Sequence, residues 1–442
     1  MMDDAAAAAT AATEPTAATG EPTAGTVPAD SAGGSRAQAE VVLPEAVPGK
    51  VLPHTWQEAR EAAWHAAEPL VAHTVPLSMA VGRILAADVF ASLAMPHYAS
   101  SAMDGWAIAG SPPWILAEPG RRLAPGQAVP IVTGGLIPTG AKAVLRSEAG
   151  ELAKDDDGLP ILVRGGDARP GEPKNAQHIR PAGQEAAEGE LLIAAGATLN
   201  PAHVSLAALG GLDELSVLGR PAVKIVLTGD EVVPSGLPEP GFVRDAFSPQ
   251  LGSVVEMLGG TVVGLQRAAD NLASMLDALA DDEDDPADVV ITTGATGHSS
   301  ADFLRAAIES MGGTFHIPHI AMRPGHPTLL AELPDGRFIV GLPGNPLAAM
   351  VGLMTLGAPL LARLGSLPMP TLSEVPCGSP IKEYQGPTRI MPYRLVYGLA
   401  SPVAHTDSAM MRGLAAADGV MAVPPHGAKM GELLPSMILP WK

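Results

Sequence analysis

The chain has 442 residues, more than one hydrophobic core usually organises, so we expect two to four domains. Its formal net charge of −20 argues against nucleic acid or an acidic membrane surface as the main partner, because both attract clustered Lys and Arg. The single cysteine, Cys377, excludes an intrachain disulfide and a metal site built from cysteines, and it fits a reducing, cytoplasmic setting.

The first 50 residues predict a disordered tail. They consist mainly of Ala, Thr, Pro, Glu and Gly, with almost no large apolar side chain to build a core. Two aspartates stand near the start, where a signal peptide would be basic. We also expect no apolar run to approach the roughly 20 residues of a membrane helix. The sequence therefore predicts neither a signal peptide nor a membrane span.

Two helices are predicted in the first half of the chain. One runs over residues 55–70, where Thr55 is a candidate N-cap and Glu58 a candidate capping-box partner. The other runs over residues 199–209, where Asn200 precedes a proline in the first turn. Both start signals are local and need no tertiary context.

The segment between these helices predicts a β-rich module. Residues 108–163 form short apolar runs broken by Pro and Gly, typical of strands and turns without helices. Just before them, Asp104 lies in the small-residue turn 101–105, where its carboxylate can stay accessible. The alternative is an aspartate that only bonds the backbone of its own turn. A second irregular segment, 177–189, carries several polar side chains.

Residues 222–364 alternate short apolar runs with helical patterns. The runs are 223–227, 289–291 and 338–340, and a polar turn containing glycine follows each. The helical patterns begin after Ser248-Pro249, Ser299-Ser300 and Asn345-Pro346. This alternation predicts an α/β domain whose mostly parallel sheet is covered on both faces.

The turns after these strands predict a ligand site. In parallel sheets ligands bind at the carboxyl ends of the strands, where the turns converge. Glycine turns and helix amino termini there expose unpaired N–H groups and the positive end of the helix dipole. We therefore expect an anionic ligand.

The remaining segments favour plainer interpretations. The acidic run 281–288 predicts a solvated loop, because dense like charges repel one another. His316 and His319 are expected on one strand, pointing to opposite faces and therefore not to one metal. Residues 367–442 alternate strands with turns and predict a small barrel or sandwich.

Several segments, in this order, resemble the molybdopterin molybdenumtransferase family, known as MoeA and as the gephyrin E domain. The resemblance extends from about residue 52 to the end of the chain. The matching pieces are PHYASSAMDGWA, VTGGLIPTGAKAV, IRPAGQEAAEG, LTGDEVVPSG, TTGATGHSSADF, MRPGHPT and GLPGNPLAAMV.

The resemblance implies a multidomain α/β plus β protein. It implies a three-layer α/β molybdopterin-binding domain, a β-rich inserted domain and a carboxyl-terminal β-barrel. The expected division is a tail (1–50), a discontinuous linking domain (51–78 and 184–220), the β-rich domain (79–183), the α/β domain (221–366) and the barrel (367–442).

The reaction implied by the resemblance belongs to molybdenum cofactor biosynthesis. It is the Mg²⁺-dependent insertion of molybdate into adenylylated molybdopterin, with release of AMP. The resemblance also implies a homodimer whose candidate partners are a molybdopterin-adenylating protein and molybdoenzymes, and the cysteine content and the amino-terminal residues predict a cytoplasmic location. Neither nucleic acid nor a membrane is expected to take part.

Site residues are carried over by position. The candidate catalytic residues are Asp104, Thr133, Glu231 and Asp302. The candidate metal ligands, which offer the oxygen atoms that Mg²⁺ prefers, are Glu231, Asp302 and Asp270. The candidate substrate-binding residues are Arg180, Glu185, Gly294, Ser299, Arg323, His326, Gly344 and Asn345.

The chain departs from the family pattern at several of these positions. Ala295 and Ser299 replace glycines of a glycine-rich loop, and added Cβ atoms could narrow a phosphate-binding turn. His326 replaces a lysine, so a permanent charge becomes one that depends on pH, and Glu185 replaces an aspartate. The alternative to an active enzyme is therefore a divergent paralogue that binds molybdopterin as a carrier or scaffold. A changed substrate, or a structural role through a dimer surface, also stays open.

Overall fold

The computed structural model describes residues 53–280, 286–294 and 303–442. The predicted tail therefore lies outside the described residues, as do Ser299 and Asp302. Residues 52–442 form one compact unit.

The first helix, α1 (Trp56–Ala66), begins as predicted. Thr55 Oγ1 accepts the Glu58 N–H at 3.2 Å, and the Glu58 carboxylate accepts the Thr55 N–H at 2.8 Å, so the capping box is confirmed. The helix ends four residues before the predicted limit, because Pro69 restricts the residue before it to extended backbone.

A six-stranded sheet forms the centre of the α/β region. Its order is β17-β14-β18-β22-β21-β19, and the first four strands are mutually parallel. The strands are β14 (Ala222–Leu227), β17 (Thr261–Arg267), β18 (Val289–Thr293), β19 (Thr314–Ile317), β21 (Leu329–Glu332) and β22 (Phe338–Leu342). The three predicted strands and the mostly parallel sheet are confirmed, and the two antiparallel strands lie at one edge.

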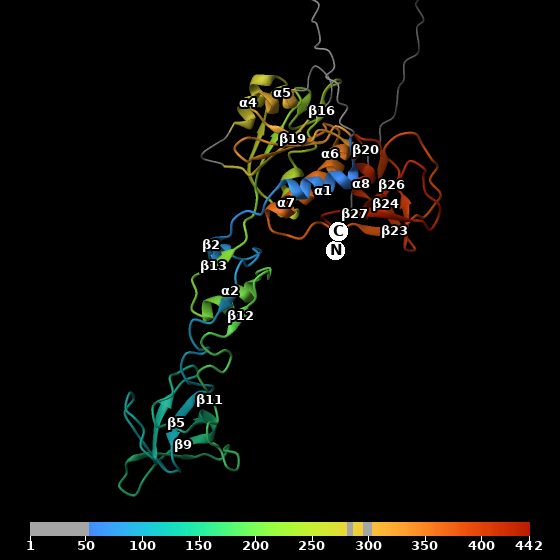
Figure 1. Ribbon diagram of the computed structural model, residues 1–442. Helices are drawn as coiled ribbons and strands as arrows, with labels where there is room; N and C mark the ends of the chain where they lie inside the picture. Colours follow the sequence, from blue (N-terminus) through green and yellow to red (C-terminus); the bar gives the residue numbers. More distant parts are fainter. Residues whose placement is uncertain (1–52, 281–285, 295–302) are drawn as a thin grey trace, which may run out of the picture. The chain divides into compact units, whose positions relative to one another are not determined.

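Helices cover both faces of this sheet, giving three layers. On one face α4 (Leu272–Leu279) and α5 (Phe303–Ser310) lie side by side (Figure 1) and pack on Val226, Val290 and Ile339. On the other face α1, α3 (Leu251–Met257) and the helix over 346–364 pack on Val223, Ile225, Leu227, Ile291 and Val340. The alternation of inward side chains along β14 explains this division.

One long apolar helix, Pro346–Leu364, spans 19 residues. It comprises α6 (Pro346–Gly352), a π-helical turn η3 (Leu353–Gly357) and α7 (Ala358–Leu364). The expectation that no apolar run approaches membrane length is wrong here, because this helix is long and apolar enough to cross a membrane. However, 94% of its apolar window is buried inside the structure, as in the core helix of a soluble protein.

The π-helical turn has a local cause. Pro359 has no N–H, and in a regular helix its ring would clash with the carbonyl four residues earlier. The wider turn immediately precedes α7, whose first residues include this proline. Inside the turn, the Thr355 hydroxyl donates to the Val351 carbonyl at 2.7 Å.

The carboxyl-terminal strands close into a barrel, as predicted. They are β23 (Ser373–Pro376), β24 (Thr388–Val396), β25 (Leu399–Pro402), β26 (Gly419–Val423) and β27 (Leu433–Ile438). Pairing runs β25-β24-β26-β27-β23, and a bridge between Cys377 and Ala400 joins the two ends. Two strands from earlier in the chain, β20 (Ile320–Arg323) and β1 (His54–Thr55), extend the sheet at β24.

The first half of the chain forms a small helical and a β-rich module. In the first, α2 (Pro201–Leu209) begins at Asn200 as predicted and packs beside β2 (His73–Pro76), β13 (Glu214–Val217), β3 (Val89–Phe90) and β12 (Leu191–Ile193). The β-rich module is a sheet of order β8-β5-β7-β6-β10-β9. Its strands are β5 (Gly105–Ala109), β6 (Trp114–Leu116), β7 (Gln127–Ile131), β8 (Ala143–Arg146), β9 (Gly150–Lys154) and β10 (Pro160–Arg164).

Three local predictions are corrected. His316 lies on β19, but His319 lies between β19 and β20, because Pro318 follows the end of the strand. The helix α3 is capped at Gln250 rather than Ser248, whose N–H bonds the Asp245 carboxylate. At the end of the acidic run, Asp288 accepts the Ala222 N–H at 2.7 Å and is half-buried.

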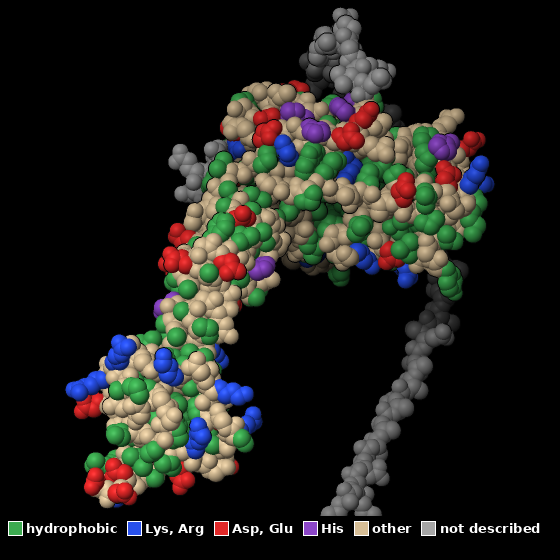
Figure 2. All heavy atoms as spheres, turned by 60° about the horizontal axis from the view of Figure 1, so that its bottom comes forward, with side chains coloured by type: hydrophobic (Ala, Val, Ile, Leu, Met, Phe, Trp, Pro, Cys, Tyr) green, Lys and Arg blue, Asp and Glu red, His purple; other side chains and the backbone are tan. Residues whose placement is uncertain are grey.

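Charged side chains differ between parts of the surface. Figure 2 shows Lys and Arg side chains around the β-rich module with Asp and Glu at its tip, and side chains of both charges interspersed with hydrophobic ones on the rest of this face.

Candidate active site

The turn after β14 is fixed to the turn after β17. The Asp270 carboxylate accepts the Gly229 N–H at 3.2 Å and the Asp230 N–H at 3.1 Å. Gly229 has φ +114°, and a Cβ there would lie 2.7 Å from Val232 Cγ2. The glycine therefore allows the turn that presents Glu231.

The turn after β18 approaches the β14 turn closely. Gly294 has φ +80°, and a Cβ there would lie 2.4 Å from the Thr228 hydroxyl oxygen. That hydroxyl donates to the Thr293 carbonyl at 2.6 Å, and the Gly294 N–H donates to Leu342 on the next strand at 2.8 Å. These contacts bring three strand ends together at one edge, as the parallel topology predicts.

A cavity of about 640 Å³ lies at this edge, which we call the Glu231 cavity. Five of the predicted site residues line it. They are Glu231, Asp270, Gly294, Gly344 and Asn345. The Thr293 hydroxyl, which also belongs to a lining residue, is buried without a hydrogen-bond partner among the described residues. Unpaired buried hydroxyls are costly, and this one lies just beneath the cavity surface.

Two carboxylates of the Glu231 cavity suit a magnesium ion. Among the described residues no group of three His, Cys, Asp or Glu side chains could hold a metal, and the third predicted ligand, Asp302, lies outside that part of the chain. Mg²⁺ commonly binds one or two carboxylates together with substrate phosphates and water. Glu231 and Asp270 therefore fit the ion as a partial ligand set.

A second cavity, of about 560 Å³, carries positive charge; we call it the Arg323 cavity. Arg323 on β20 and Arg389 on β24 are register partners on neighbouring parallel strands. Neither makes a salt bridge within the described residues, and the Arg389 guanidinium stacks over Tyr384, 4.6 Å from the ring centre. Paired guanidinium groups of this kind bind oxyanions.

His326 adds an imidazole to the Arg323 cavity. Its Nδ1 lies 2.6 Å from the Ile320 carbonyl, so Nδ1 carries the proton that it donates. Nε2 is then the nitrogen left for a ligand. The same cavity also contains Asp407 and Ser408, which follow the barrel strand β25.

Asn345 lines both the Glu231 cavity and the Arg323 cavity. It is the N-cap residue of α6, yet its side chain makes no capping hydrogen bond to the helix. The amide is therefore available on an exposed residue between the two cavities. The helix dipole adds partial positive charge at the same point.

The predicted residues of the β-rich half lie in other places. The Asp104 carboxylate accepts the Thr133 N–H at 2.6 Å and the Thr133 hydroxyl at 2.9 Å. These two hydrogen bonds, the backbone one first, lower the pKa of Asp104. The aspartate does not bond only its own turn, because its partner lies on the loop after β7.

Arg180 and Glu185 line a third cavity, of about 570 Å³. His97, Tyr98 and Gln184 lie in it too, and the Tyr98 hydroxyl donates to the Gly134 carbonyl at 3.2 Å. Arg180 is on a short strand, β11 (Ile179–Arg180), which pairs with β4 (Ser100–Ser101). Within one subunit this cavity contains none of the residues that line the Glu231 cavity.

The sequence-based prediction missed several residues of these cavities. Arg389 and Ser408 belong to the barrel, and only the pairing of β20 with β24 brings them beside Arg323. Arg244 lines the Glu231 cavity from β16 (Val243–Arg244). In the sequence, no local pattern distinguishes these residues from other arginines and serines of the surface. The sequence alone therefore could not predict that they line a cavity.

Comparison with known proteins identifies the family. Residues 54–211 match the model of the MoeA N-terminal region (domain I and II), and residues 224–363 match that of a probable molybdopterin binding domain. The molybdopterin molybdenumtransferase 2 of Mycobacterium tuberculosis is 32% identical over 385 residues, covering 79% of this chain and 90% of that protein. The molybdopterin molybdenumtransferase of Haemophilus influenzae is 33% identical over 238 residues, covering 54% of this chain and 56% of that protein.

Solved structures agree with these sequence matches. The crystal structure of a molybdopterin biosynthesis MoeA protein from Pyrococcus horikosii has a TM-score of 0.64 and 25% identity, over 88% of this chain and 99% of that one. The multidomain α/β plus β fold and the identity over most of the chain lead to one conclusion. This chain belongs to the molybdopterin molybdenumtransferase family.

Proposed function

We propose that the protein inserts molybdate into adenylylated molybdopterin in a Mg²⁺-dependent reaction that releases AMP. The observation that carries this proposal is the pair of adjoining cavities that share Asn345. One has carboxylates and glycine turns suited to a metal and phosphates, and the other has guanidinium groups suited to an oxyanion. A reaction between a nucleotide-bearing pterin and molybdate needs both.

The Arg323 cavity would hold the molybdate. Arg323 and Arg389 can each donate two parallel hydrogen bonds to a tetrahedral oxyanion. His326 would be the third residue to contact the oxyanion, through Nε2 when both ring nitrogens are protonated. Asn345 would orient the substrate between the two cavities, because its amide offers both a donor and an acceptor.

The Glu231 cavity would hold the phosphates. Bound by Glu231 and Asp270, Mg²⁺ would neutralise phosphate charge and polarise the bond that is broken. The Gly294 N–H is already bonded to Leu342, so the start of α6 and the Asn345 amide are the donors left for the ligand. Asp302 and Ser299 would complete this site.

We further infer that the working enzyme is a homodimer. Asp104, Thr133, Arg180 and Glu185 are polar, and all four are exposed, yet they share no cavity with Glu231 in one subunit. A second subunit would supply them to the site. A cytoplasmic location, with a molybdopterin-adenylating protein and molybdoenzymes as partners, accords with this reaction.

Release of AMP tests the proposal. The full-length protein is incubated with Mg²⁺, molybdate and adenylylated molybdopterin, and AMP is measured by chromatography. Glu231→Gln keeps the shape of the side chain but removes its charge, so we expect AMP release to fall about 100-fold or more. Glu374→Gln, which changes an exposed carboxylate on β23, should release AMP like the wild type.

Two outcomes separate the alternatives. If the wild type releases no AMP while a family enzyme assayed in parallel does, the protein is not an active transferase. Calorimetric binding of molybdopterin by that inactive protein would then support the carrier or scaffold. Equal AMP release by the wild type and by Glu231→Gln would show that Glu231 is not a metal ligand.

A further inference from the structure

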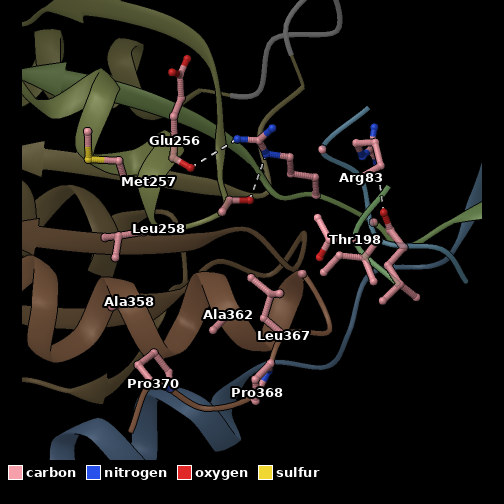
Figure 3. A pocket seen from close by; sticks show the side chains of 17 residues that line it. Arg83, Thr198, Glu256, Met257, Leu258, Ala358, Ala362, Leu367, Pro368 and Pro370 are labelled. Carbon is pink, nitrogen blue, oxygen red and sulfur yellow. Dashed lines mark hydrogen bonds between the residues drawn. The ribbon is translucent and has the colours of Figure 1, made fainter. Parts of the chain in front are cut away.

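A cavity of about 450 Å³ lies apart from the proposed catalytic cavities and shares no lining residue with them. It lies where the chain passes from the small helical module, through Leu218 and Gly219, into the α/β region. Figure 3 shows Arg83 and Thr198 on one side, and Leu258, Ala358, Ala362 and Leu367 along another.

The charged side chains of this cavity are Arg83, Arg220 and Glu256. Arg83 Nη2 donates to the Leu218 carbonyl at 3.0 Å, and Arg220 Nε donates to the Gly260 carbonyl at 2.9 Å. Glu256 accepts from Arg220 only through its backbone carbonyl, and Figure 3 shows its carboxylate pointing away from that contact.

Neither arginine is neutralised. Within the part of the chain that the structure describes, no carboxylate pairs with Arg83 or Arg220, and Nη1 of each makes no hydrogen bond. Burial, followed by the positive charge of Arg220, lowers the pKa of Arg83. Two like charges beside one cavity, in a chain of net charge −20, destabilise each other and would be stabilised by an anion.

The rest of the lining is mostly apolar. Leu258, Ala358, Ala362, Leu367 and Pro370 face the space without a polar side chain among them. Ligand sites commonly combine an apolar wall with a few convergent polar groups. A volume of about 450 Å³ is within the range of small-molecule sites.

We propose that this cavity binds a small organic anion, a phosphate or carboxylate carried on an aromatic or aliphatic body, as a second ligand site independent of the transferase reaction. The anion would lie between the guanidinium groups of Arg83 and Arg220. The apolar body would pack against the Leu258 and Leu367 side of the cavity.

Calorimetry on the full chain with phenyl phosphate tests this inference. Phenyl phosphate should bind at least about fivefold more tightly than inorganic phosphate, because only the former contacts the apolar wall. Arg83→Gln and Arg220→Gln should each weaken binding about tenfold, through loss of a charged hydrogen bond. Arg83→Lys, which keeps the charge, should recover part of the affinity.

Two controls make the result specific. Arg394→Gln changes an exposed arginine on β24 and should not alter binding of phenyl phosphate. Arg164→Gln changes an exposed arginine on β10 and should not alter it either, whether or not the protein proves to be a transferase. Absence of binding by the wild type overturns the inference. So does binding of phenyl phosphate that the Arg83 and Arg220 variants both retain, or that Arg394→Gln abolishes.

Discussion

At the scale of single side chains, some residues of the candidate site could be predicted from local sequence signals, and others only from the tertiary structure. Glu231 and Asn345 follow strands in glycine-containing turns that can be found from the sequence, and Gly229 has the positive φ that the turn before Glu231 requires. Arg389 could not be found that way. Its position beside Arg323 depends on the register of two strands that are distant in the chain.

We predict that Arg389→Gln raises the KM for molybdate about tenfold, because one guanidinium of the oxyanion pair is lost. The kcat for AMP release should change less, since the metal and phosphate ligands are untouched. The measurement is the rate of AMP release at increasing molybdate concentration. Arg394→Gln, on the same strand but an odd number of residues away, is the matched control. An unchanged KM would exclude Arg389 from molybdate binding.

At the scale of elements, strands and capped helices follow from the sequence. The strands β14, β18 and β22 are uninterrupted apolar runs, and α1 and α2 begin at side chains that cap them. The start of α3 does not follow, because the Ser248 N–H and hydroxyl bond the Asp245 carboxylate instead of capping the helix. The Asp245 carboxylate bonds Arg267 as well as the Ser248 side chain and the Phe247 N–H.

We predict that Asp245→Asn destabilises the protein by about 2–3 kcal/mol at pH 7, because Arg267 loses its buried partner. Burial alone would raise the pKa of Asp245, but hydrogen bonds from Ser248 and Phe247 and the charge of Arg267 outweigh it and lower the pKa. A lowered pKa in the folded state stabilises the protein above the unfolded pKa of about 4, and this contribution is lost as pH falls further.

The difference between the wild type and Asp245→Asn should therefore shrink when unfolding by urea is measured at successively lower pH, down to about pH 3. Asp277→Asn changes an aspartate of α4 whose side chain makes no hydrogen bond or ion pair among the described residues, and this variant should behave like the wild type. A difference that stays constant over this pH range would assign the effect of Asp245 to packing rather than to charge.

At the scale of the whole molecule, the order of modules follows from composition and turn spacing, whereas their boundaries do not. Val75, Leu85 and Val89 pack with Ile193 and Leu215. We therefore propose that residues 79–90 belong with the linking domain rather than the β-rich domain. The periodicity of the sequence is similar in both modules, so only packing distinguishes them.

The proposed homodimer makes a prediction at the same scale. Asp104→Asn and Glu231→Gln should each abolish AMP release, yet the two variants expressed together should recover about a quarter of wild-type activity. Half of the dimers would then contain both variants, and each of these would have one intact site if sites form across subunits. Two copies of Glu231→Gln expressed together are the control. If the mixed variants release no more AMP than this control, each site is formed within a single subunit.

The helix over 346–364 starts at Asn345, between the Glu231 and Arg323 cavities, and continues through the core with its π turn and Pro359. The orientation of its first turn about the helix axis therefore depends on buried side chains around the π turn, which do not contact a ligand. A substitution that regularised the π turn would rotate the Asn345 amide about the helix axis, since an α-helix turns by about 100° for each residue. Specificity for the metal oxyanion could thus evolve from the protein interior, without any change in the residues that contact it.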